Sequence, residues 1–343
     1  MAAAAPRPLR VGLLSFAHTH AETYATLLRR RDDVELVTCD PGPHPDGELR
    51  GEAAAAAWGV EHVASADELL ALGLDAVVVA SENARHRELV EPALDAGCHV
   101  LCEKPLATSR EDAAAMRAAV QRSGRFLVVA YPVRFSSAFG QLRDLVAGGA
   151  LGQLLSVRGT NNGKLPTSRS WFTDPALSGG GALVDHVVHL ADLLDVLTGG
   201  AQALTVSAVG NSLLHPGAAA ETAGLVAITY PDGLVAAIDC SWSVPESAAS
   251  WGGLALTAAG TGGTVSADVF GSKVRGLQSS TGLPVELPYG PDLDERMLDA
   301  FLDGVRTGGA PQPDLEVGAR TLSVVLAAQE SYRTGTTVAV RPV

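Results

Sequence analysis

The sequence has few cysteines, no long hydrophobic run and a shortage of basic residues, and each shortage excludes a class of protein. The 343-residue chain holds four cysteines and no pair with CxxC spacing, which argues against a disulfide framework and favours buried thiols in a reducing compartment. No apolar run approaches the length of a membrane-spanning helix. The N-terminal segment places its charge after the small residues and contains proline, unlike a signal peptide. We therefore expect a cytoplasmic protein.

The charge balance is acidic, with 25 Lys and Arg against 38 Asp and Glu and a net charge of -13. This balance disfavours nucleic acid and anionic membrane surfaces as partners. Apolar residues make up 47% and charged residues 18%, which is typical of a globular protein. The length favours two domains with sizeable cores.

The first third of the chain alternates apolar strands with helices. Strands are predicted at Leu9–Phe16, Val34–Cys39, Asp75–Ala80, His99–Cys102 and Phe126–Ala130. Helices are predicted at His20–Arg31, Glu48–Trp58 and Arg85–Asp95, after the capping box at Ser65, and from Ser109 to Gly124. This order predicts a doubly wound parallel sheet of the Rossmann type over residues 1–130, typical of dinucleotide-binding domains.

In the remainder, residues 131–343, most strand-like runs are linked by turns and not by helices. Strand-like runs follow one another across Gly, Pro and Asp turns at Gln153–Gly159, Ala203–Gly210, Leu225–Tyr230, Leu234–Trp242, Leu254–Ala259 and Thr264–Phe270. Helices are expected at Ala138–Ala147, Gly179–Leu197, Asp292–Arg306 and Glu316–Tyr332. The pattern predicts a second, α+β domain with a mostly antiparallel open sheet.

The turn after the first predicted strand departs from a dinucleotide fingerprint. When Gly-x-Gly-x-x-Gly is set in register, its glycine positions fall on Ser15, Ala17 and His20. Small residues at the first two still permit close approach of a pyrophosphate, but the histidine does not match. Asp40, at the end of the second strand, is either a ribose acceptor that favours NAD over NADP or a turn residue before Pro41.

Lys104 follows a short apolar strand in the segment Glu103-Lys104-Pro105. The carboxyl ends of parallel strands form the edge where ligands bind, and Pro105 ends the strand. The alternative is a surface lysine beside a turn proline.

A second cluster follows three glycines. Asp185, His189 and Asp192 have i, i+4, i+7 spacing and share one face of a predicted helix. A histidine can take a hydroxyl proton near neutral pH, and a nearby carboxylate can orient it or bind a second hydroxyl. The alternative is an Asp–His pair that stabilises a solvated helix.

Several segments, taken together, resemble the Gfo/Idh/MocA family of NAD(P)-dependent oxidoreductases over nearly the whole chain. They are Ser81-Glu-Asn-Ala-Arg-His86, Gly97-Cys-His-Val-Leu-Cys-Glu103-Lys104-Pro105, Tyr131-Pro-Val-Arg134-Phe, Trp171-Phe, Asp185-x-x-x-His189-x-x-Asp192, Phe301…Gly308 and Ser331…Gly335. The resemblance implies hydride transfer between a secondary alcohol of a sugar, inositol or related polyol and the nicotinamide of NAD, with NADP possible. It also implies a homodimer or homotetramer.

The resemblance assigns roles to individual residues. Lys104 would contact the nicotinamide side and the reacting hydroxyl, His189 would be the general base, and Asp185 would bind the substrate or the histidine. The expected cofactor contacts are Ser15, Phe16, Ala17, His18, His20, Asp40, Ser81, Asn83, His86, Glu103, Lys104 and Arg134. The expected substrate contacts are Lys104, Tyr131, Lys164, Trp171, Asp185, His186 and His189.

Extra histidines distinguish the chain from the common pattern of that family. His18 and His20 in the turn, with His186 and His189, are plausible ligand types for zinc or another divalent ion. We favour contacts to cofactor or substrate for the turn histidines and packing for His186, with no metal. Two further hypotheses stay open: a metal-assisted or NAD-recycling lyase or isomerase, and a catalytically silent dinucleotide-binding regulator.

Overall fold

A computed structural model describes residues 7–343, so part of the N-terminal segment used for the signal-peptide expectation, residues 1–6, lies outside it. The described chain divides into two compact units. The first contains the described part of 1–130 with Ser168–Ser170 and Leu298–Leu315; the second contains Tyr131–Thr167, Trp171–Met297 and Glu316–Val343. Two short later segments thus join the N-terminal unit, in addition to the residues before 131.

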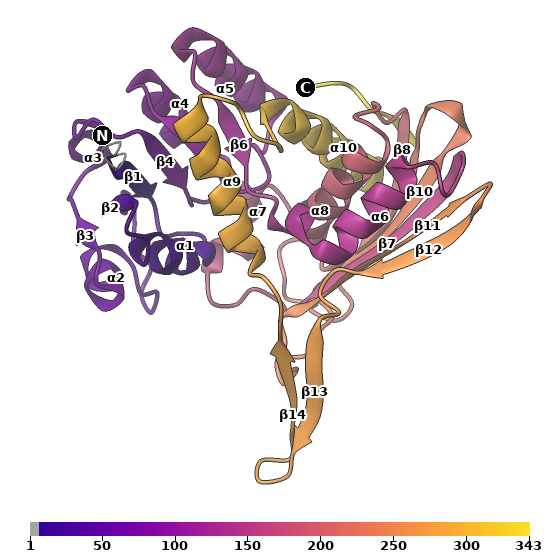
Figure 1. Ribbon diagram of the computed structural model, residues 1–343. Coiled ribbons are helices and arrows are strands. Elements are labelled where there is room, and N and C mark those ends of the chain that lie inside the picture. Colours follow the sequence, from indigo (N-terminus) through magenta and orange to yellow (C-terminus); the bar gives the residue numbers. More distant parts are fainter. Residues whose placement is uncertain (1–6) are drawn as a thin grey trace, which may run out of the picture. The chain divides into compact units, whose positions relative to one another are not determined.

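The first unit is built on a six-stranded sheet in the order β3-β2-β1-β4-β5-β6, with parallel neighbours throughout (Figure 1). Its strands are β1 Leu9–Leu14, β2 Val34–Cys39, β3 Glu61–His62, β4 Ala76–Val79, β5 His99–Cys102 and β6 Leu127–Val129. This is the doubly wound order of dinucleotide-binding folds, whose ligands bind where the strand order reverses, beside β1 and β4. The Rossmann prediction is confirmed, and only β3 escaped the sequence patterns.

Helices separate these strands, and local sequence explains where they begin and end. They are α1 His20–Arg29, α2 Gly51–Trp58, α3 Ala66–Leu70, the 3-10 turn η1 Asn83–Arg85, α4 His86–Asp95 and α5 Arg110–Ser123. The Ser65 and Ser109 side chains accept hydrogen bonds from the N–H groups of Glu68 and Asp112, as N-caps do. Gly124 ends α5 in the left-handed conformation that glycine favours.

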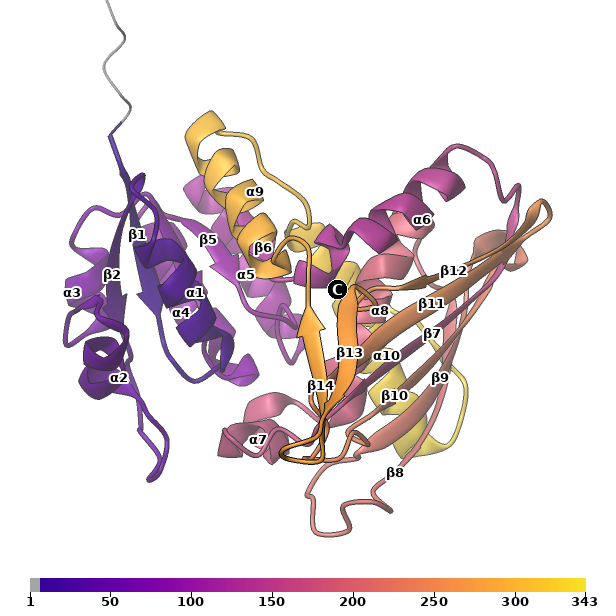
Figure 2. The same cartoon turned by 60° about the horizontal axis from the view of Figure 1, so that its bottom comes forward.

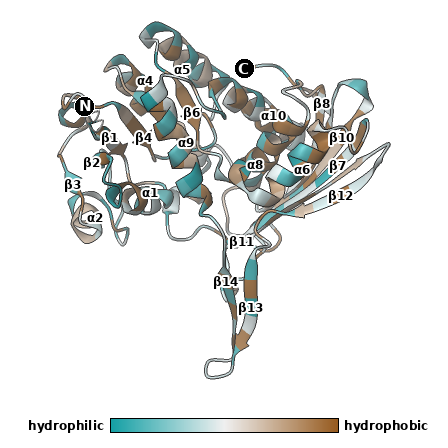
Figure 3. Cartoon of the chain, viewed as in Figure 1, coloured by the Kyte–Doolittle hydropathy of each residue, from teal (hydrophilic) through white to brown (hydrophobic). Residues whose placement is uncertain are grey.

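The core of this unit lies around the central strands. Every residue of β4 and β5 is buried, and Figure 3 shows β4 in the hydrophobic colours. A strand that is covered on both faces has an unbroken run of apolar residues in its sequence. This is the pattern from which the parallel sheet was predicted.

The second unit is built on a seven-stranded sheet in the order β12-β11-β7-β10-β9-β8-β15. The strands are β7 Leu154–Gly163, β8 Thr205–Asn211, β9 Ala223–Thr229, β10 Val235–Ser241, β11 Gly252–Gly260, β12 Gly263–Asp268 and β15 Val338–Ala339. All neighbouring pairs are antiparallel except β10 with β7, so the prediction of a mostly antiparallel sheet is confirmed.

Helices cover one face of this sheet, as Figures 1 and 2 show for α6, α8 and α10. The unit contains the 3-10 turns η2 Pro132–Phe135 and η4 Pro231–Gly233 and the helices α6 Ser137–Ala147, α7 Pro175–Ser178 and α8 Ala182–Leu197. The turn η3 Ser170–Thr173 and the helix α10 Leu315–Thr334 each begin with one residue of the first unit and continue in this one, while α9 Leu293–Thr307 runs from this unit into the first. Buried and exposed residues alternate along β9 and β10, so the other face of the sheet is open within this unit.

A hairpin forms a separate two-stranded sheet that the sequence patterns did not predict. Its strands are β13 Lys273–Gln278 and β14 Leu283–Pro288, and it projects away from the seven-stranded sheet (Figure 1). Leu277 and Leu287, one on each strand, are exposed.

Two expectations about the chain's surroundings can be compared with the structure. Among residues 7–343, no helix combines the length and apolarity needed to cross a bilayer. All four cysteines are buried and free, and burial raises the pKa of the Cys39 and Cys98 thiols to about 11.

Candidate functional site

The turn between β1 and α1 lies at the carboxyl edge of the first sheet. Ser15 occupies the first glycine position with a φ of 74°, in the left-handed region that normally favours glycine. Ala17 is fully buried at the second position, and α1 begins directly after the turn. The turn therefore keeps the backbone path of a dinucleotide site although its glycines are replaced.

His18 and His20, the turn's two histidines, gather around Glu103. The Nδ1 atom of His20 lies 2.9 Å from Glu103 Oε1, and that of His18 lies 3.6 Å away. The Tyr24 hydroxyl donates to the same oxygen at 2.6 Å. Burial of Glu103 opposes its ionisation, but the facing histidine charges and these hydrogen bonds hold its pKa well below the usual range. Glu103 is therefore a buried carboxylate that stays charged.

Lys104 is connected to this cluster through the backbone. It follows β5 directly and is 5% exposed, so it is not the surface lysine of the alternative interpretation. Its N–H donates to Glu103 Oε2 at 3.1 Å. The buried carboxylate thereby fixes the backbone at the lysine.

Asp40 is enclosed by donors from its own unit. Arg50 Nε and Nη2 donate to its two oxygens at 2.8 and 2.9 Å, and the N–H groups of Phe16 and Gly51 donate at 2.8 Å. Burial opposes ionisation, but Arg50 and these N–H groups lower the Asp40 pKa. The carboxylate is fully buried, so a ribose contact would have to compete with four donors. Its evident role is to tie the turn to the start of α2.

The other predicted cofactor residues of the first unit lie on loops at the same sheet edge. Phe16 is buried, and its ring packs against Trp58 with centroids 4.7 Å apart. Ser81 and Asn83 are buried beyond the end of β4. His86 donates from Nδ1 to the Pro105 carbonyl at 2.9 Å, and burial lowers its pKa, so it is a neutral ring that holds the lysine loop.

These features fit an NAD-binding site in strand order, turn path and helix position. The Thr19 side chain makes no capping hydrogen bond at the start of α1, where helix N–H groups favour an anion such as a pyrophosphate. Ser15, Ala17 and the residues after β4 and β5 would hold the dinucleotide.

In the second unit, α8 carries the predicted acid–base residues. Asp185 Oδ2 accepts a hydrogen bond from Trp242 Nε1 at 3.0 Å and lies 3.1 Å from His186 Nε2. The other ring nitrogen of His186 donates to the Asn161 carbonyl on β7 at 2.9 Å. His186 is buried, so it joins the helix to the sheet and positions Asp185.

His189 lies one turn further along α8 and is partly exposed. The Tyr131 ring meets it edge-on, with centroids 6.3 Å apart. Tyr131 itself is fully buried, and its hydroxyl lies 2.8 Å from Thr321 Oγ1. Tyr131 thus shapes the surroundings of His189, and its hydroxyl is engaged by Thr321.

Arg134, predicted as a cofactor contact, forms an ion pair with Asp192 in which Nε donates to Oδ2 at 3.2 Å. Burial raises the Asp192 pKa to about 6, against the opposing charge of Arg134. The third position of the α8 motif, Asp192, is therefore held by an arginine.

Glu221 is a residue that sequence reasoning missed. Its Oε1 accepts from the N–H groups of Gly181 and Leu183, at 2.9 and 3.0 Å, and so caps the helix that carries Asp185 and His189. A Cβ on Gly181 would stand 1.9 Å from the Glu221 carbonyl oxygen, which explains the glycine there.

The remaining predicted substrate residues lie on loops of the second unit. Lys164 follows β7, and its ammonium donates to the Glu246 carbonyl at 2.8 Å. Trp171 is buried and stacks on Phe172, with ring centroids 3.9 Å apart.

The structure does not group the four histidines that we considered as metal ligands into one cluster of its described residues. In the described chain, three potential ligands converge at His18, His20 and Glu103, with ligand atoms within 4.8 Å of one another. His186 instead bonds Asn161 and Asp185.

The missed partners share one property, which is distance along the chain. Arg50 lies 10 positions from Asp40, and Trp242 lies 57 positions from Asp185. Glu221 lies 40 and 38 positions from the two residues whose N–H groups it accepts. Tyr24, a further partner that the sequence analysis missed, differs because its position could have been predicted locally: it lies four residues after His20 on α1, and such residues are neighbours on a helix surface.

Comparisons with known proteins agree with this arrangement. Residues 12–131 match the oxidoreductase family with an NAD-binding Rossmann fold, and residues 139–266 match the GFO/IDH/MocA C-terminal domain. The chain is 30% identical to the 1,5-anhydro-D-fructose reductase of Ensifer adhaerens, over 83% of this chain and 86% of that protein. It is 34% identical to the D-glucoside 3-dehydrogenase of Escherichia coli K12, over 54% of this chain and 52% of the relative, about half its length.

A solved structure shows the same likeness over the whole chain. The structure of GenD2 from gentamicin A biosynthesis, in complex with NAD, has a TM-score of 0.87 and 25% identity, and the match covers 99% of each chain. With both family domains present in order, and a relative at 30% identity over most of its length, the chain belongs to the Gfo/Idh/MocA family of NAD-binding oxidoreductases.

Proposed function

We propose that the protein transfers hydride between a secondary alcohol of a sugar, inositol or related polyol and NAD. The observation that carries this proposal is a buried Lys104 placed directly after β5, on the ligand-binding edge of an NAD-binding sheet. The relatives named as sugar-acting reductases and dehydrogenases support the substrate class.

When bound, the nicotinamide accepts or supplies the hydride. Lys104 contributes a positive charge that stabilises the alkoxide developing on the reacting oxygen. His189 accepts the hydroxyl proton during oxidation and returns it during reduction. Both groups are needed because a hydride leaves a carbinol carbon readily only after its oxygen loses the proton.

Asp185 has the role of a substrate-binding carboxylate. Trp242 and His186 fix one of its oxygens, at 3.0 and 3.1 Å. A carboxylate held in this way can accept a hydrogen bond from a second hydroxyl and so orient a polyol ring.

The proposed cofactor is NAD, with NADP as the competing possibility. A buried, ionised Asp40 places negative charge at the end of β2, and such a charge repels a 2′-phosphate. Arg50 neutralises part of that charge, which is why the preference must be measured.

We propose that the chain forms a homo-oligomer through the open face of its second sheet and acts in the cytoplasm. Val209 and Leu225 are neighbours in register on β8 and β9, and they are 65% and 57% exposed. An exposed apolar patch of this kind marks an interaction surface. The four free, buried thiols support a reducing compartment. Light scattering on the wild type and on Leu225→Glu tests the interface.

The test of function is an assay of nicotinamide reduction at its absorbance band, with NAD⁺ or NADP⁺ and a panel of D-glucose, methyl glucoside and myo-inositol. Lys104→Ala and His189→Ala should each lower kcat by about 100-fold or more. Lys273→Ala, which removes a lysine from the projecting hairpin, is the matched control and should retain wild-type activity. Full activity in either site variant would contradict the proposal; cofactor binding without turnover would revive the regulator hypothesis.

A further inference from the structure

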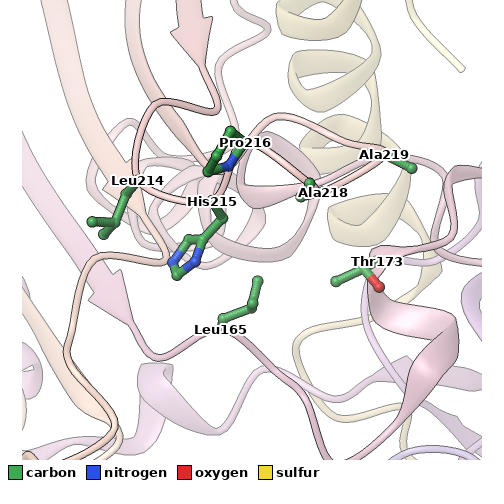
Figure 4. A pocket seen from close by; sticks show the side chains of 8 residues that line it. Leu165, Thr173, Leu214, His215, Pro216, Ala218 and Ala219 are labelled. Carbon is green, nitrogen blue, oxygen red and sulfur yellow. The ribbon is translucent and has the colours of Figure 1, made fainter.

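The second unit contains a pocket of about 510 Å³ that the proposed chemistry does not use. Three loops line it: the loop after β7, the end of η3 and the connection from β8 to β9 (Figure 4). Its lining residues are Leu165, Thr173, Leu214, His215, Pro216, Gly217, Ala218 and Ala219. Pockets that hold small molecules have about this volume.

One tryptophan joins a wall of this pocket to Asp185. His215 Nε2 donates to the Trp242 carbonyl oxygen at 2.8 Å, and Trp242 Nε1 donates to Asp185 at 3.0 Å. Trp242 is 1% exposed, so this connection is part of the core. His215 on the pocket wall is therefore bonded to the backbone of the tryptophan whose side chain holds the proposed substrate-binding carboxylate.

The other walls also adjoin residues of the candidate site. Leu165 follows Lys164, and Thr173 ends the 3-10 turn that contains Trp171. The connection from β8 to β9 continues into Glu221, which caps the helix of Asp185 and His189. The pocket and Asp185 are thus connected through bonded and sequence-adjacent residues of the same unit.

The lining differs from the acid–base groups in its chemistry. It contains no charged side chain; Leu165, Pro216 and the alanines supply apolar surface, while His215 and Thr173 supply polar groups. In Figure 4 the Leu165 side chain and the His215 ring approach each other at the pocket. A sugar ring that must bind carboxylate and lysine gains little from such walls, whereas an uncharged and partly apolar group gains from burial there.

We infer that this pocket receives the aglycone of a glycoside whose sugar ring is oxidised at the proposed site. The inference rests on the proposed function and narrows its substrate class from free polyols to sugars carrying an uncharged, partly apolar substituent. The pocket contributes binding to the substituent, and Asp185 and His189 act on the ring hydroxyls.

The test compares D-glucose, methyl β-D-glucoside and phenyl β-D-glucoside with the full chain and NAD⁺. The kcat/KM should rise in that order, with phenyl glucoside about tenfold above glucose through a lower KM. Ala218→Phe fills the pocket and should bring phenyl glucoside down to the level of glucose while turnover of glucose is unchanged. Leu165→Ser, which makes one wall polar, should act in the same direction.

Leu213→Ala is the matched control, because Leu213 is 85% exposed on the same loop and does not line the pocket. It should leave all three kcat/KM values unchanged. Equal kcat/KM values for the three wild-type substrates, or equal losses on glucose and phenyl glucoside in Ala218→Phe, would overturn the inference. If no sugar is oxidised, the proposed function fails separately, and calorimetry with phenyl glucoside on the wild type and Ala218→Phe still decides whether the pocket binds the ring.

Discussion

His20 and Glu103 are joined by a contact of 2.9 Å between Nδ1 and Oε1, which connects the start of α1 to the residue before Lys104. The two residues are 83 positions apart, and the carboxylate is fully buried. A charged group in such a position is stable only when it is paired and hydrogen-bonded. The turn between β1 and α1 and the proposed catalytic lysine are thus held by the same carboxylate.

Glu103→Gln should therefore weaken both stability and activity. The amide keeps the shape but loses the charge that His18, His20 and Tyr24 face, so we expect unfolding to become easier by about 2–3 kcal/mol and kcat to fall about tenfold. Tyr24→Phe removes one donor and should cost about 1 kcal/mol with activity retained. Urea unfolding and steady-state kinetics measure the two effects, and a Glu103→Gln protein equal to Tyr24→Phe in both would contradict this account.

The depressed pKa of Glu103 predicts how stability depends on pH. The folded protein holds this group well below its ordinary value of 4.5, so it binds fewer protons when folded than when unfolded. Its contribution is complete above the ordinary value and is lost as the pH falls below it. Unfolding curves between pH 3 and 7 should show a steeper acid loss for the wild type than for Glu103→Gln. Parallel curves would exclude a charged Glu103.

Arg50→Met tests the role of Asp40. The variant leaves a buried carboxylate without its ion-pair partner, which should cost about 3–5 kcal/mol of unfolding free energy. The KM for NAD⁺ should also rise, since Asp40 accepts from the Phe16 N–H in the turn that we propose binds the cofactor. Arg87→Met removes an exposed arginine of α4 and is the control, expected to leave the unfolding curve nearly unchanged.

Trp242→Phe isolates the donor to Asp185. The ring remains apolar, but the Nε1 donor at 3.0 Å is lost, so Asp185 loses one of the two partners that fix its Oδ2 atom. We expect kcat to fall about tenfold with a modest change in the thermal midpoint. Trp58→Phe, in the first unit, should change the thermal midpoint but not the kcat or KM for sugar oxidation. A thermal loss in Trp242→Phe without any kinetic change would assign the tryptophan to packing only.

Removal of metal should leave activity unchanged. His20 bonds Glu103 directly, and His18 Nδ1 lies 3.2 Å from the His20 backbone nitrogen and 3.6 Å from Glu103, so these groups are engaged with one another. Dialysis against a chelator, followed by assay and elemental analysis, checks this. Loss of activity that returns with one equivalent of zinc would instead support the metal-assisted hypothesis.

Sequence patterns predicted the elements of this fold better than the partners within the site. Alternating apolar strands and capped helices are local signals, so β2 and β5 were predicted with their exact bounds. β3 and β15 have two residues each, too few to show a periodicity. The pairing of β7 with β10 in parallel is also invisible locally, because it depends on how distant strands are ordered in the sheet.

The site divides in the same way. The lysine, the α8 motif and the unusual turn were visible as motifs, but the burial of Asp40 by Arg50 and the fixing of Asp185 by Trp242 depend on tertiary placement. The sequence could also not distinguish a histidine that meets a ligand from one that packs, and His186 lies between helix and sheet.

The projecting hairpin of β13 and β14 offers a protease a cleavage site whose loss leaves both large sheets intact. Trypsin would meet the exposed Arg275 on a strand that pairs with the other strand of the hairpin, outside the seven-stranded sheet. A nick there severs the covalent chain without removing any strand from either large sheet. The loop between Gln278 and Leu283 is accordingly a natural position for inserting a purification tag or a fluorescent reporter.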